Sequence, residues 1–598
     1  MPTIQQTLAT VFGFHQFRPP QQEVIERVVA GEDVFLVMPT GGGKSLCYQV
    51  PALHRSGLAI VVSPLISLMK DQVDALVANG IRAALLNSSL STVEARAVSA
   101  RIDAGSIDLL YVAPERLMMA EFLDKIATIS LALFAIDEAH CISQWGHDFR
   151  PEYTRLGRLR ELFPDIPLIA MTATADPQTR DDIINQLGIR AAKVFVAGFD
   201  RPNIIYTVLP KQKPAVQLAG FLAGRRDEAG IVYALSRKRV EQVAERLQQE
   251  GFSAAAYHAG LSDKERQRVQ NAFQRDDIRI VVATVAFGMG IDKPNVRFVF
   301  HYDMPKSVES YYQETGRAGR DGLPSEALML FGMGDVMTAR KLIENSDNAE
   351  RVRIEIQKLN AMVSYAEALT CRRRALLAYF GDLREHQCDN CDICTDPPER
   401  FDATVAAQKA LSCVYRVGER FGTMHLIEVL RGSKSQRIMD LQHNKLSTYG
   451  IGADISAAEW ENIFRQLIHL GYLLQDFSRY GVLKLSSAAR PVLKGETQVV
   501  LGRPRNPVQT VEKVKKRTGG KRDYDQTLFD ALRIRRKQLA DAAGVPPFVV
   551  FSDATLAEMA RLMPTDADQL HTISGVGELK LSRYGKSFLE VIQKHTDR

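Results

Sequence analysis

A run of glycines followed by Lys and Ser is the first segment of this sequence that could do chemistry. Pro39–Ser45 has the sequence PTGGGKS and directly follows the apolar run Val34–Met38. Glycines let backbone N–H groups converge on phosphate oxygens, and the amino end of a following helix adds a favourable dipole. We therefore expect Lys44 to reach the β- and γ-phosphates of a nucleotide and the Ser45 hydroxyl to ligate Mg²⁺. The alternative is a Gly-rich turn that binds nothing, because the usual pattern begins with Gly where this chain has Met38.

Two adjacent acids follow a second apolar run. Asp137 and Glu138 come directly after Leu131–Ile136. An acid at the carboxyl end of a strand, beside a phosphate loop, can hold Mg²⁺, and a neighbouring acid can orient or deprotonate an attacking water. We assign Asp137 as the metal ligand and Glu138 as the general base. Taken alone, two such acids would more often be a solvated loop, and it is the Gly-rich loop that favours the catalytic interpretation.

Two arginines lie in a glycine-punctuated segment much further along the chain. Gln313–Arg320 has the sequence QETGRAGR. Arg317 and Arg320, exposed by the glycines, could reach across a cleft and stabilise charge that develops on a γ-phosphate, as an arginine finger does. The alternative is a charge pair on the surface.

Three of the seven cysteines are clustered, as Cys388, Cys391 and Cys394. Tetrahedral Zn²⁺ in a closed structural site takes four nitrogen or sulfur ligands. Cys371, upstream, is the expected fourth ligand, and His386 competes with it. An iron–sulfur cluster is the other metal group that four cysteines suit. We expect the remaining cysteines, Cys47, Cys141 and Cys413, to be ordinary small side chains.

The elements that must position these groups are short apolar runs that alternate with amphipathic helices, in two series. The first series of strand-like runs is Val34–Met38, Ala59–Ser63, Leu109–Val112, Leu131–Ile136 and Leu168–Thr172. The second series is Gly230–Ala234, Ala254–Tyr257, Arg279–Ala283, Arg297–Tyr302 and Ala327–Phe331. Runs that end at polar or Gly-rich loops are typical of parallel α/β sheets. We therefore predict two α/β lobes joined at Asp200–Asn203, where Pro202 blocks a helix.

Beyond Phe331 the pattern becomes helical, to about Asp382. After the cysteines, an amphipathic helix over Glu459–Leu470 is followed by a hairpin whose turn is Ser478–Gly481. A helix followed by a hairpin is the order of a winged-helix module. Helical patterns return from Asp523 to the end.

Composition excludes several classes of protein. Of the 598 residues, 45% are apolar and 24% are charged, which is ordinary for a globular protein and excludes a disordered or fibrous chain. No apolar run approaches the length of a membrane helix, and the start of the chain has no pattern of a secretion signal, so we expect a cytoplasmic protein. The net charge is only +6, yet residues 503–537 alone carry +8. Such a segment could follow phosphates, although a solvated linker is the more common reason for a charge run.

Together these segments resemble superfamily 2 helicases, and most closely the RecQ family of DNA helicases, over nearly the whole chain. The motifs that carry the resemblance are Phe14–Gln21, Pro39–Ser45, Ser63–Leu68, Ala113–Arg116, Asp137–His140, Thr172–Thr174, Thr284–Asp292 and Gln313–Arg320. The family uses a variant phosphate loop, which accounts for Met38. Phe14–Gln21 is similar to its adenine-reading segment, in which an aromatic ring stacks on the base and a Gln reads its edge.

The resemblance implies a role for each matched residue. The implied ATP-binding residues are Phe14, Gln16, Arg18, Gln21, Thr40, Gly41, Gly42, Gly43, Lys44 and Ser45. The implied catalytic residues are Lys44, Asp137, Glu138, His140, Gln313, Arg317 and Arg320. Mg²⁺ is assigned to Ser45 and Asp137, and Zn²⁺ to Cys371, Cys388, Cys391 and Cys394.

DNA contacts are implied for several aromatic residues. Cys141–Pro151, with the sequence CISQWGHDFRP, distinguishes the RecQ family from its relatives and follows the two acids. Aromatic side chains that stack on bases contribute about 1–3 kcal/mol each. The DNA-binding residues expected here and in the later modules are Trp145, Phe149, Arg150, Tyr480 and Phe548. By pattern alone, Trp145 and Phe149 would more often belong to a core.

The expected architecture is a multidomain α/β protein with two RecA-like parallel-sheet lobes, a helical zinc-binding module, a winged helix and a small all-α C-terminal bundle of the HRDC type. The expected boundaries are 1–200 for lobe 1, 201–335 for lobe 2, 336–399 for the zinc module, 400–502 for the winged helix, 503–522 for a basic linker and 523–598 for the HRDC domain.

The resemblance implies an ATP-dependent DNA helicase that moves 3′ to 5′ on single-stranded DNA and unwinds duplex DNA in recombination, repair and replication-fork maintenance. The expected cofactors and partners are ATP, Mg²⁺, Zn²⁺, and single-stranded and duplex DNA. Single-stranded DNA-binding protein and other repair factors are expected as further partners of a nucleoid-associated, cytoplasmic monomer. Two alternatives stay open: an RNA helicase with the same two ATP-hydrolysing lobes, and a non-catalytic zinc/winged-helix DNA-binding protein.

Overall fold

The computed structural model describes residues 2–64, 66–87, 90–143, 149–175, 177–287, 293–345, 348–382, 384, 386–476, 482–503 and 523–597. The chain divides into two compact units. The first comprises Met1–Leu359, Leu376–His386 and Val511–Arg598, and the second comprises Asn360–Ala375 and Gln387–Thr510. Of the helices within these ranges, none is long and apolar enough to cross a membrane.

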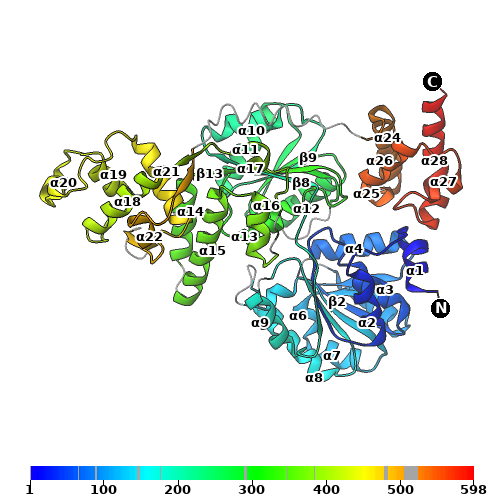
Figure 1. Ribbon diagram of the computed structural model, residues 1–598. Coiled ribbons are helices and arrows are strands. Elements are labelled where there is room, and N and C mark those ends of the chain that lie inside the picture. The colour runs from blue at the N-terminus through cyan, green and yellow to red at the C-terminus, as the bar shows by residue number, and fades with distance from the viewer. Residues whose placement is uncertain are drawn as a thin grey trace. The chain divides into compact units, whose positions relative to one another are not determined.

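The first unit begins with a parallel seven-stranded sheet, which we call lobe 1. Its spatial order is β3-β4-β2-β5-β6-β1-β7. The strands are β1 (Val34–Val37), β2 (Leu58–Val62), β3 (Ala83–Leu86), β4 (Leu109–Val112), β5 (Leu131–Ile136), β6 (Leu168–Thr172) and β7 (Lys193–Val196). Every residue of β1, β2, β4, β5 and β6 is buried, as expected for a parallel sheet that is covered on both faces. Figure 1 shows the strands of this sheet between helices.

The helices of lobe 1 are α1 (Ile4–Thr7), η1 (Leu8–Phe12), α2 (Gln21–Ala30), α3 (Leu46–His54), α4 (Ile66–Ala78), α5 (Thr92–Asp103), α6 (Pro114–Leu117), α7 (Ala120–Ala127), η2 (Ala139–Ile142), η3 (Pro151–Gly157), α8 (Arg158–Leu162) and α9 (Pro177–Leu187). They supply part of one continuous core with the strands, for example Val24 and Val28 from α2 and Cys47 from α3.

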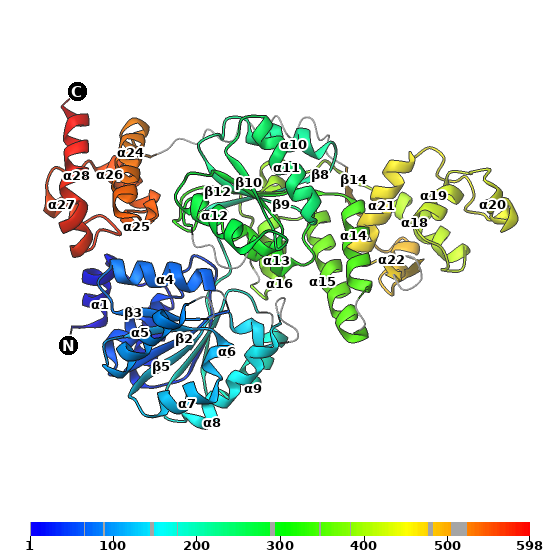
Figure 2. The same ribbon diagram turned by 180° about the vertical axis from the view of Figure 1, so that it is seen from behind.

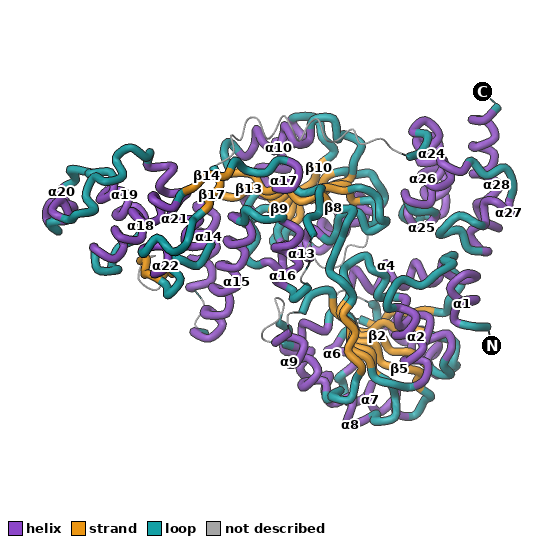
Figure 3. Tube along the Cα trace, viewed as in Figure 1, coloured by secondary structure: helices purple, strands orange, loops and turns teal. Residues whose placement is uncertain are grey.

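A second parallel sheet, of six strands, forms lobe 2. Its order is β10-β11-β9-β12-β13-β8. The strands are β8 (Ile204–Pro210), β9 (Ala229–Tyr233), β10 (Ala254–Tyr257), β11 (Ile280–Ala283), β12 (Val296–His301) and β13 (Ser325–Phe331). The helical segments after β8 are α10 (Pro214–Leu222), α11 (Arg237–Gln249), α12 (Asp263–Gln274), η4 (Val285–Phe287), α13 (Val308–Thr315), α14 (Met333–Glu344) and α15 (Ala349–Glu367). Figure 3 shows both sheets as orange strands among purple helices.

The first unit also contains the C-terminal helices. These are α24 (Gln526–Ala543), α25 (Pro547–Val550), α26 (Asp553–Leu562), α27 (Ala567–His571) and α28 (Glu578–Thr596). They pack around a core of their own that includes Leu528, Leu556 and Phe588. Figure 2 shows this bundle from behind.

The second unit holds the cysteines and a helix-and-hairpin module. After α16 (Arg372–Tyr379), its elements are α17 (Asp392–Thr395), β14 (Arg400–Asp402), α18 (Thr404–Arg416), α19 (Thr423–Leu430), α20 (Gln436–Asp440), η5 (His443–Lys445), α21 (Ala457–His469), β15 (Leu473–Asp476), β16 (Val482–Leu485), α22 (Ala489–Leu493) and β17 (Val500–Gly502). β15 and β16 pair antiparallel, as expected for the wing of a winged helix. Trp460 and Phe464 of α21 are fully buried in the core of this unit.

The predicted fold class is therefore confirmed. The differences concern strands. The first predicted series lacks β3 and β7, and the second lacks β8. In addition, β14 pairs with β17 across about 100 residues of chain. The turn Ser478–Gly481 and almost all of the predicted basic linker lie outside the described residues.

Candidate functional site

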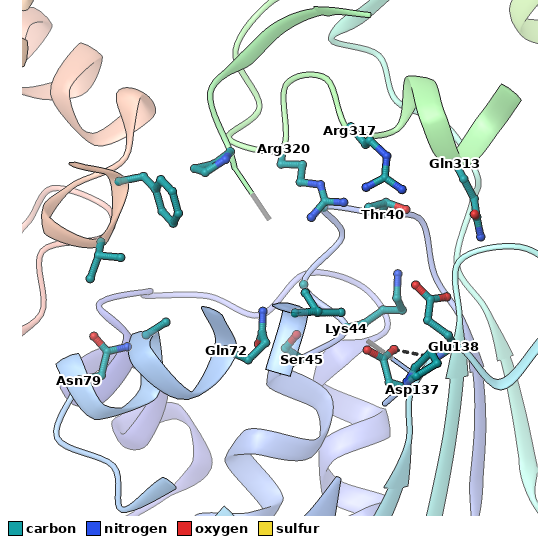
Figure 4. Close-up of a pocket in the computed structure, with 18 of the residues that line it drawn as sticks. Thr40, Lys44, Ser45, Gln72, Asn79, Asp137, Glu138, Gln313, Arg317 and Arg320 are labelled. Atoms are coloured by element: carbon teal, nitrogen blue, oxygen red, sulfur yellow. Dashed lines mark hydrogen bonds between the residues drawn. The ribbon is translucent and has the colours of Figure 1, made fainter. Parts of the chain in front are cut away.

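A cavity of about 390 Å³ brings the predicted phosphate, acid and arginine residues together. Lobe 1 contributes Thr40, Lys44, Ser45, Asp137 and Glu138, and lobe 2 contributes Gln313, Arg317 and Arg320. Figure 4 shows Lys44 and Asp137 on one side and both arginines opposite. Strands of a parallel sheet end at one edge, so loops that are distant in sequence meet there.

The loop Pro39–Ser45, which we call the phosphate loop, lies between the end of β1 and the start of α3. Lys44 Nζ donates to the backbone oxygens of Met38 (3.0 Å) and Pro39 (3.4 Å). Gly41 and Gly43 have positive φ, of 77° and 90°, which glycine adopts without steric cost. A Cβ at Gly43 would lie 2.5 Å from Nε2 of Gln21, so the tight loop needs a glycine there.

Two residues of the predicted adenine-reading segment support the phosphate loop. Gln21 is buried and its Nε2 donates to the backbone oxygens of Gly42 (3.3 Å) and Gly43 (3.0 Å). Arg18 Nη1 donates to the oxygen of Gly41 at 3.0 Å. Phe14 is 38% exposed, as a ring that stacks on a base requires, and Gln16 is exposed as well.

The acidic pair follows β5. The backbone N–H of Glu138 donates to Oδ1 of Asp137 (3.0 Å), and the hydroxyl of Tyr153 donates to the backbone oxygen of Asp137 (3.1 Å). Glu138 has a left-handed backbone, with φ of 49°. A non-glycine residue held there costs on the order of 1–3 kcal/mol and is often found at a functional site.

A chain of polar contacts leads from Glu138 to lobe 2. His140 is buried, and its Nδ1 lies 3.3 Å from Oε2 of Glu138 and 2.9 Å from the hydroxyl of Thr172. The Thr172 hydroxyl in turn donates to the backbone oxygen of Thr174 at 3.2 Å. Gln313 Nε2 donates to the hydroxyl of Thr174 at 3.3 Å. The predicted catalytic residues His140 and Gln313 are thus linked through the Thr172–Thr174 motif.

The arginines belong to Gly316–Arg320, which we call the arginine loop and which follows α13. Arg317 is only 7% exposed, so the expectation that the glycines expose it is wrong, although it still lines the cavity. Gly319, with φ of 56°, packs so closely that a Cβ would lie 2.4 Å from Nδ2 of Asn203. A tightly packed loop fixes the direction in which Arg317 and Arg320 leave the backbone.

Other residues of the cavity wall were given no role in the site by the sequence, although Pro64 and Leu68 lie in the motif Ser63–Leu68 and Cys141 begins Cys141–Pro151. These other residues are Pro64, Leu68, Gln72, Ala75, Asn79, Cys141, Pro294, Val549 and Lys580. Burial lowers the pKa of Lys580 to about 8, because desolvation disfavours the charged ammonium group. Phe548, which the sequence analysis assigns to DNA, lines this same cavity.

The predicted DNA-binding residues are only partly described. Trp145 and Tyr480 lie outside the described residues. Phe149 lines a second cavity, of about 520 Å³, together with Thr284, Gln313 and Arg317. Arg150 links its segment to the loop after β2, because its Nη1 donates to the backbone oxygen of Pro64 at 3.0 Å. Gln313 and Arg317 line both cavities.

The four predicted zinc ligands come together in the second unit. The sulfur atoms of Cys371, Cys388, Cys391 and Cys394 all lie within 4.8 Å of one another. Tetrahedral bonds of 2.3 Å to zinc place sulfur atoms about 3.8 Å apart, and the Cys388 and Cys394 sulfurs are 3.9 Å apart. The pKa of Cys388 is lowered, because the thiols of Cys371 and Cys391 donate to its sulfur. Four thiolates fit Zn²⁺ and leave no open position, and His386 is not part of the cluster.

Comparison with known proteins covers nearly all of this architecture. Residues 18–183 match the DEAD/DEAH box helicase model and residues 213–322 match the helicase conserved C-terminal domain. Residues 333–395 match the RecQ zinc-binding model, residues 397–510 the RQC domain and residues 525–592 the HRDC domain.

Whole-length relatives agree with these matches. The chain is 50% identical to the ATP-dependent DNA helicase RecQ of Haemophilus influenzae, over 99% of this chain and 96% of the relative. It is 49% identical to that of Pasteurella multocida, over 99% of this chain and 94% of the relative, and 44% identical to that of Bacillus subtilis, over 99% and 98%. With all five of these domains and this identity along its whole length, the chain belongs to the RecQ family of ATP-dependent DNA helicases.

Proposed function

We propose that the chain hydrolyses ATP between its two α/β lobes and uses the resulting motion to travel 3′ to 5′ on single-stranded DNA and to separate duplex DNA. One observation carries the proposal: Lys44 and Asp137 of lobe 1 line the same cavity as Arg317 and Arg320 of lobe 2. A terminal phosphate held by both lobes links them, and its release lets them separate.

The residues of the cavity divide the chemistry among them. Lys44 binds the β- and γ-phosphates, and Arg317 and Arg320 stabilise the charge that spreads over the γ-phosphate oxygens in the transition state. Glu138 orients and deprotonates the attacking water. Ser45 and Asp137 present the oxygen ligands that Mg²⁺ prefers, and this ion, when bound, would neutralise phosphate charge.

The second cavity supports a link between DNA and hydrolysis. Phe149 belongs to Cys141–Pro151 and shares this cavity with Gln313 and Arg317, which also line the first cavity. A nucleotide base that stacks on Phe149 would therefore press on side chains that face the γ-phosphate. DNA is the expected activator, bound by the lobes, the winged helix and the HRDC domain of a monomer at the nucleoid, in the cytoplasm. Single-stranded DNA-binding protein and other repair factors are the proposed protein partners.

Replacing Glu138 with Gln should lower the rate of DNA-stimulated ATP hydrolysis by about 10²- to 10⁴-fold, because the amide has a similar shape but cannot accept the proton of water. ATP should still bind, since the phosphate loop is untouched. Steady-state hydrolysis and binding of a fluorescent nucleotide measure the two effects. Glu121→Gln, at an exposed position of α7, is the matched control and should behave as the unchanged protein. Loss of nucleotide binding in Glu138→Gln would contradict the assigned role.

Duplexes that carry one single-stranded tail, either 3′ or 5′, test the proposed function. A duplex with only a 3′ single-stranded tail should be unwound with ATP, and one with only a 5′ tail should not, because the motor loads on and follows one strand. RNA of the same sequence should not stimulate ATP hydrolysis. Unwinding from the 5′ tail, or stimulation by RNA equal to that by DNA, would refute the proposal in its present form.

A further inference from the structure

Arg201 lies in Asp200–Asn203, the predicted join between the lobes, three residues before β8, and the sequence assigns it no role of its own. Its side chain is buried, with 8% of the residue exposed. It does not line the cavity that contains Lys44 and Arg320. A buried guanidinium needs partners for its five N–H donors, and the partners that it has are unusual.

The guanidinium donates to backbone oxygens of both catalytic loops. Nη1 donates to Thr40 of the phosphate loop at 2.5 Å and to Gly316 of the arginine loop at 3.0 Å. Nη2 donates to Ala318 and Gly319, each at 2.9 Å. These three acceptors of the arginine loop flank Arg317 and lead directly to Arg320. The planar guanidinium of Arg201 therefore holds the arginine loop in place and sets its distance from the phosphate loop.

The backbones of the two loops approach closely around this guanidinium. A Cβ at Gly41 would lie 3.3 Å from Cα of Arg320 and 3.4 Å from Nη1 of Arg201. A Cβ at Gly316 would lie 3.5 Å from Cβ of Thr40. The approach at Gly41 is tighter than an ordinary contact and the one at Gly316 is an ordinary contact, so the two loops pack directly against each other around Arg201.

The contacts of Arg201 are unequal. Three of the four hydrogen bonds are to lobe 2 and one is to lobe 1. Asn203 strengthens the lobe 2 side, because its Nδ2 donates to the backbone oxygens of Gly319 and Leu323, each at 2.9 Å. When the lobes separate, the bond to Thr40 is the one that breaks, while Arg201 stays with the arginine loop.

We propose that Arg201 is a positioning residue that aligns the arginine loop with the phosphate loop in the closed state and releases Thr40 when the lobes open. This inference rests on the proposed function, since it assumes that closure around the γ-phosphate precedes hydrolysis. Arg201 touches no phosphate, so it acts through Arg317 and Arg320. It favours the closed state over the open one and leaves the binding of ADP to lobe 1 unchanged.

The positive charge of Arg201 alone cannot align the arginine loop with the phosphate loop. Lys would retain the positive charge but offers a single nitrogen in place of a planar fork, so it cannot reach four carbonyl oxygens on two loops at once. Burial lowers the pKa of Arg201, but a guanidinium stays protonated in proteins, so its N–H donors are retained. Arg201→Lys is therefore the informative variant, and Arg201→Met, which retains the length without the donors, is its companion.

The test compares the affinity for ADP with the affinity for ADP plus aluminium fluoride, which mimics the transferring phosphoryl group. A hydrogen bond to a charged group is worth about 1.5–3 kcal/mol, so each variant should lose about 10- to 100-fold in affinity for the mimic. The rate of DNA-stimulated hydrolysis should fall by a similar factor. Affinity for ADP alone should stay within about 2-fold, because closure is not needed to bind it.

The matched control is Arg225→Lys. Arg225 is also buried in lobe 2, at 7% exposure, but it pairs with Glu228 (3.1 Å) and Glu326 (2.5 Å) and lines neither cavity. It should lower the melting temperature and leave the ratio of the two affinities unchanged. If Arg201→Lys and Arg201→Met also lower the melting temperature but leave that ratio unchanged, or if ADP and the mimic lose affinity equally, the role of Arg201 is merely structural and the proposal is wrong.

The affinity ratio requires no turnover. An unchanged protein that closes on the mimic but is not stimulated by DNA would refute the proposed function, while the Arg201 variants would still give a readable answer. The two proposals can therefore fail separately.

Discussion

Replacing Arg320 with Ala should lower the rate of DNA-stimulated ATP hydrolysis by about 10³- to 10⁵-fold, the range that an arginine finger contributes. The side chain lines the same cavity as Lys44 but comes from the other lobe. It stabilises the charge that spreads over the γ-phosphate in the transition state more than the charge of bound ATP, so the rate should fall far more than nucleotide affinity does. Steady-state hydrolysis at saturating DNA, together with binding of a fluorescent ATP analogue, measures both quantities.

Two further variants sharpen this experiment. Arg226→Ala removes an exposed arginine of lobe 2 that donates to the backbone oxygen of Gly251 at 3.0 Å, and it should hydrolyse ATP at the normal rate. Arg320→Lys should recover only part of the loss, because a point charge cannot replace a planar fork. A rate for Arg320→Ala within about 3-fold of normal would remove Arg320 from the transition state.

Replacing Cys391 with Ser should unfold much of the second unit. Cys391 is fully buried and lies in the cluster of four cysteines. Structural zinc contributes about 10–16 kcal/mol of binding free energy, which is as large as the total stability of a typical domain, about 5–15 kcal/mol. We expect about one zinc per chain in the native protein, and in the variant a loss of zinc with rapid proteolysis between residues 360 and 510. Elemental analysis and limited proteolysis measure these outcomes.

The buried ion pair beside the cluster explains why the loss should spread. Arg372 Nε lies 3.1 Å from Oδ1 of Asp392, and both residues are buried next to zinc ligands in the sequence. Cys371 precedes Arg372 and Cys391 precedes Asp392 in the sequence, so without metal the bonds that hold the two ends of this pair together are lost. Cys413→Ala is the matched control, because Cys413 is buried in the same unit but does not belong to the cluster; it should retain its zinc. A native protein without zinc, or one with the visible absorbance of an iron–sulfur cluster, would refute the metal assignment.

The sequence predicts most central strands well, and of the four edge strands of the two large sheets it predicts only β10. The predicted bounds match those of β4, β5, β6 and β10, because each is a continuous run without charged residues, and all but one of these residues are buried. β7 was not predicted, since Phe195 is the one buried residue among its four. β14 and β17 are only three residues each and pair between distant parts of the chain. Such pairing depends on the tertiary fold, which periodicity does not report.

The site also contains residues that the sequence could predict and residues that it could not. Lys44, Asp137, Arg317 and Arg320 could be predicted, because their residue types carry the chemistry and glycines or strand ends mark their places. The contacts of Arg201 could not, because its partners are backbone oxygens, which have no signature in a sequence. The wall formed by Val549 and Lys580 likewise depends on how the C-terminal helices pack within the first unit.

Because Glu138 has a positive φ, thermal stability and catalytic rate favour different residues at this one position. Glycine would relieve the steric cost of that backbone conformation but would delete the carboxylate that the proposed chemistry needs. A screen that selects only for survival at high temperature would thus tend to enrich inactive proteins altered at this codon. The strained backbone at Glu138 is therefore the kind of stability cost that proteins commonly carry where function demands it.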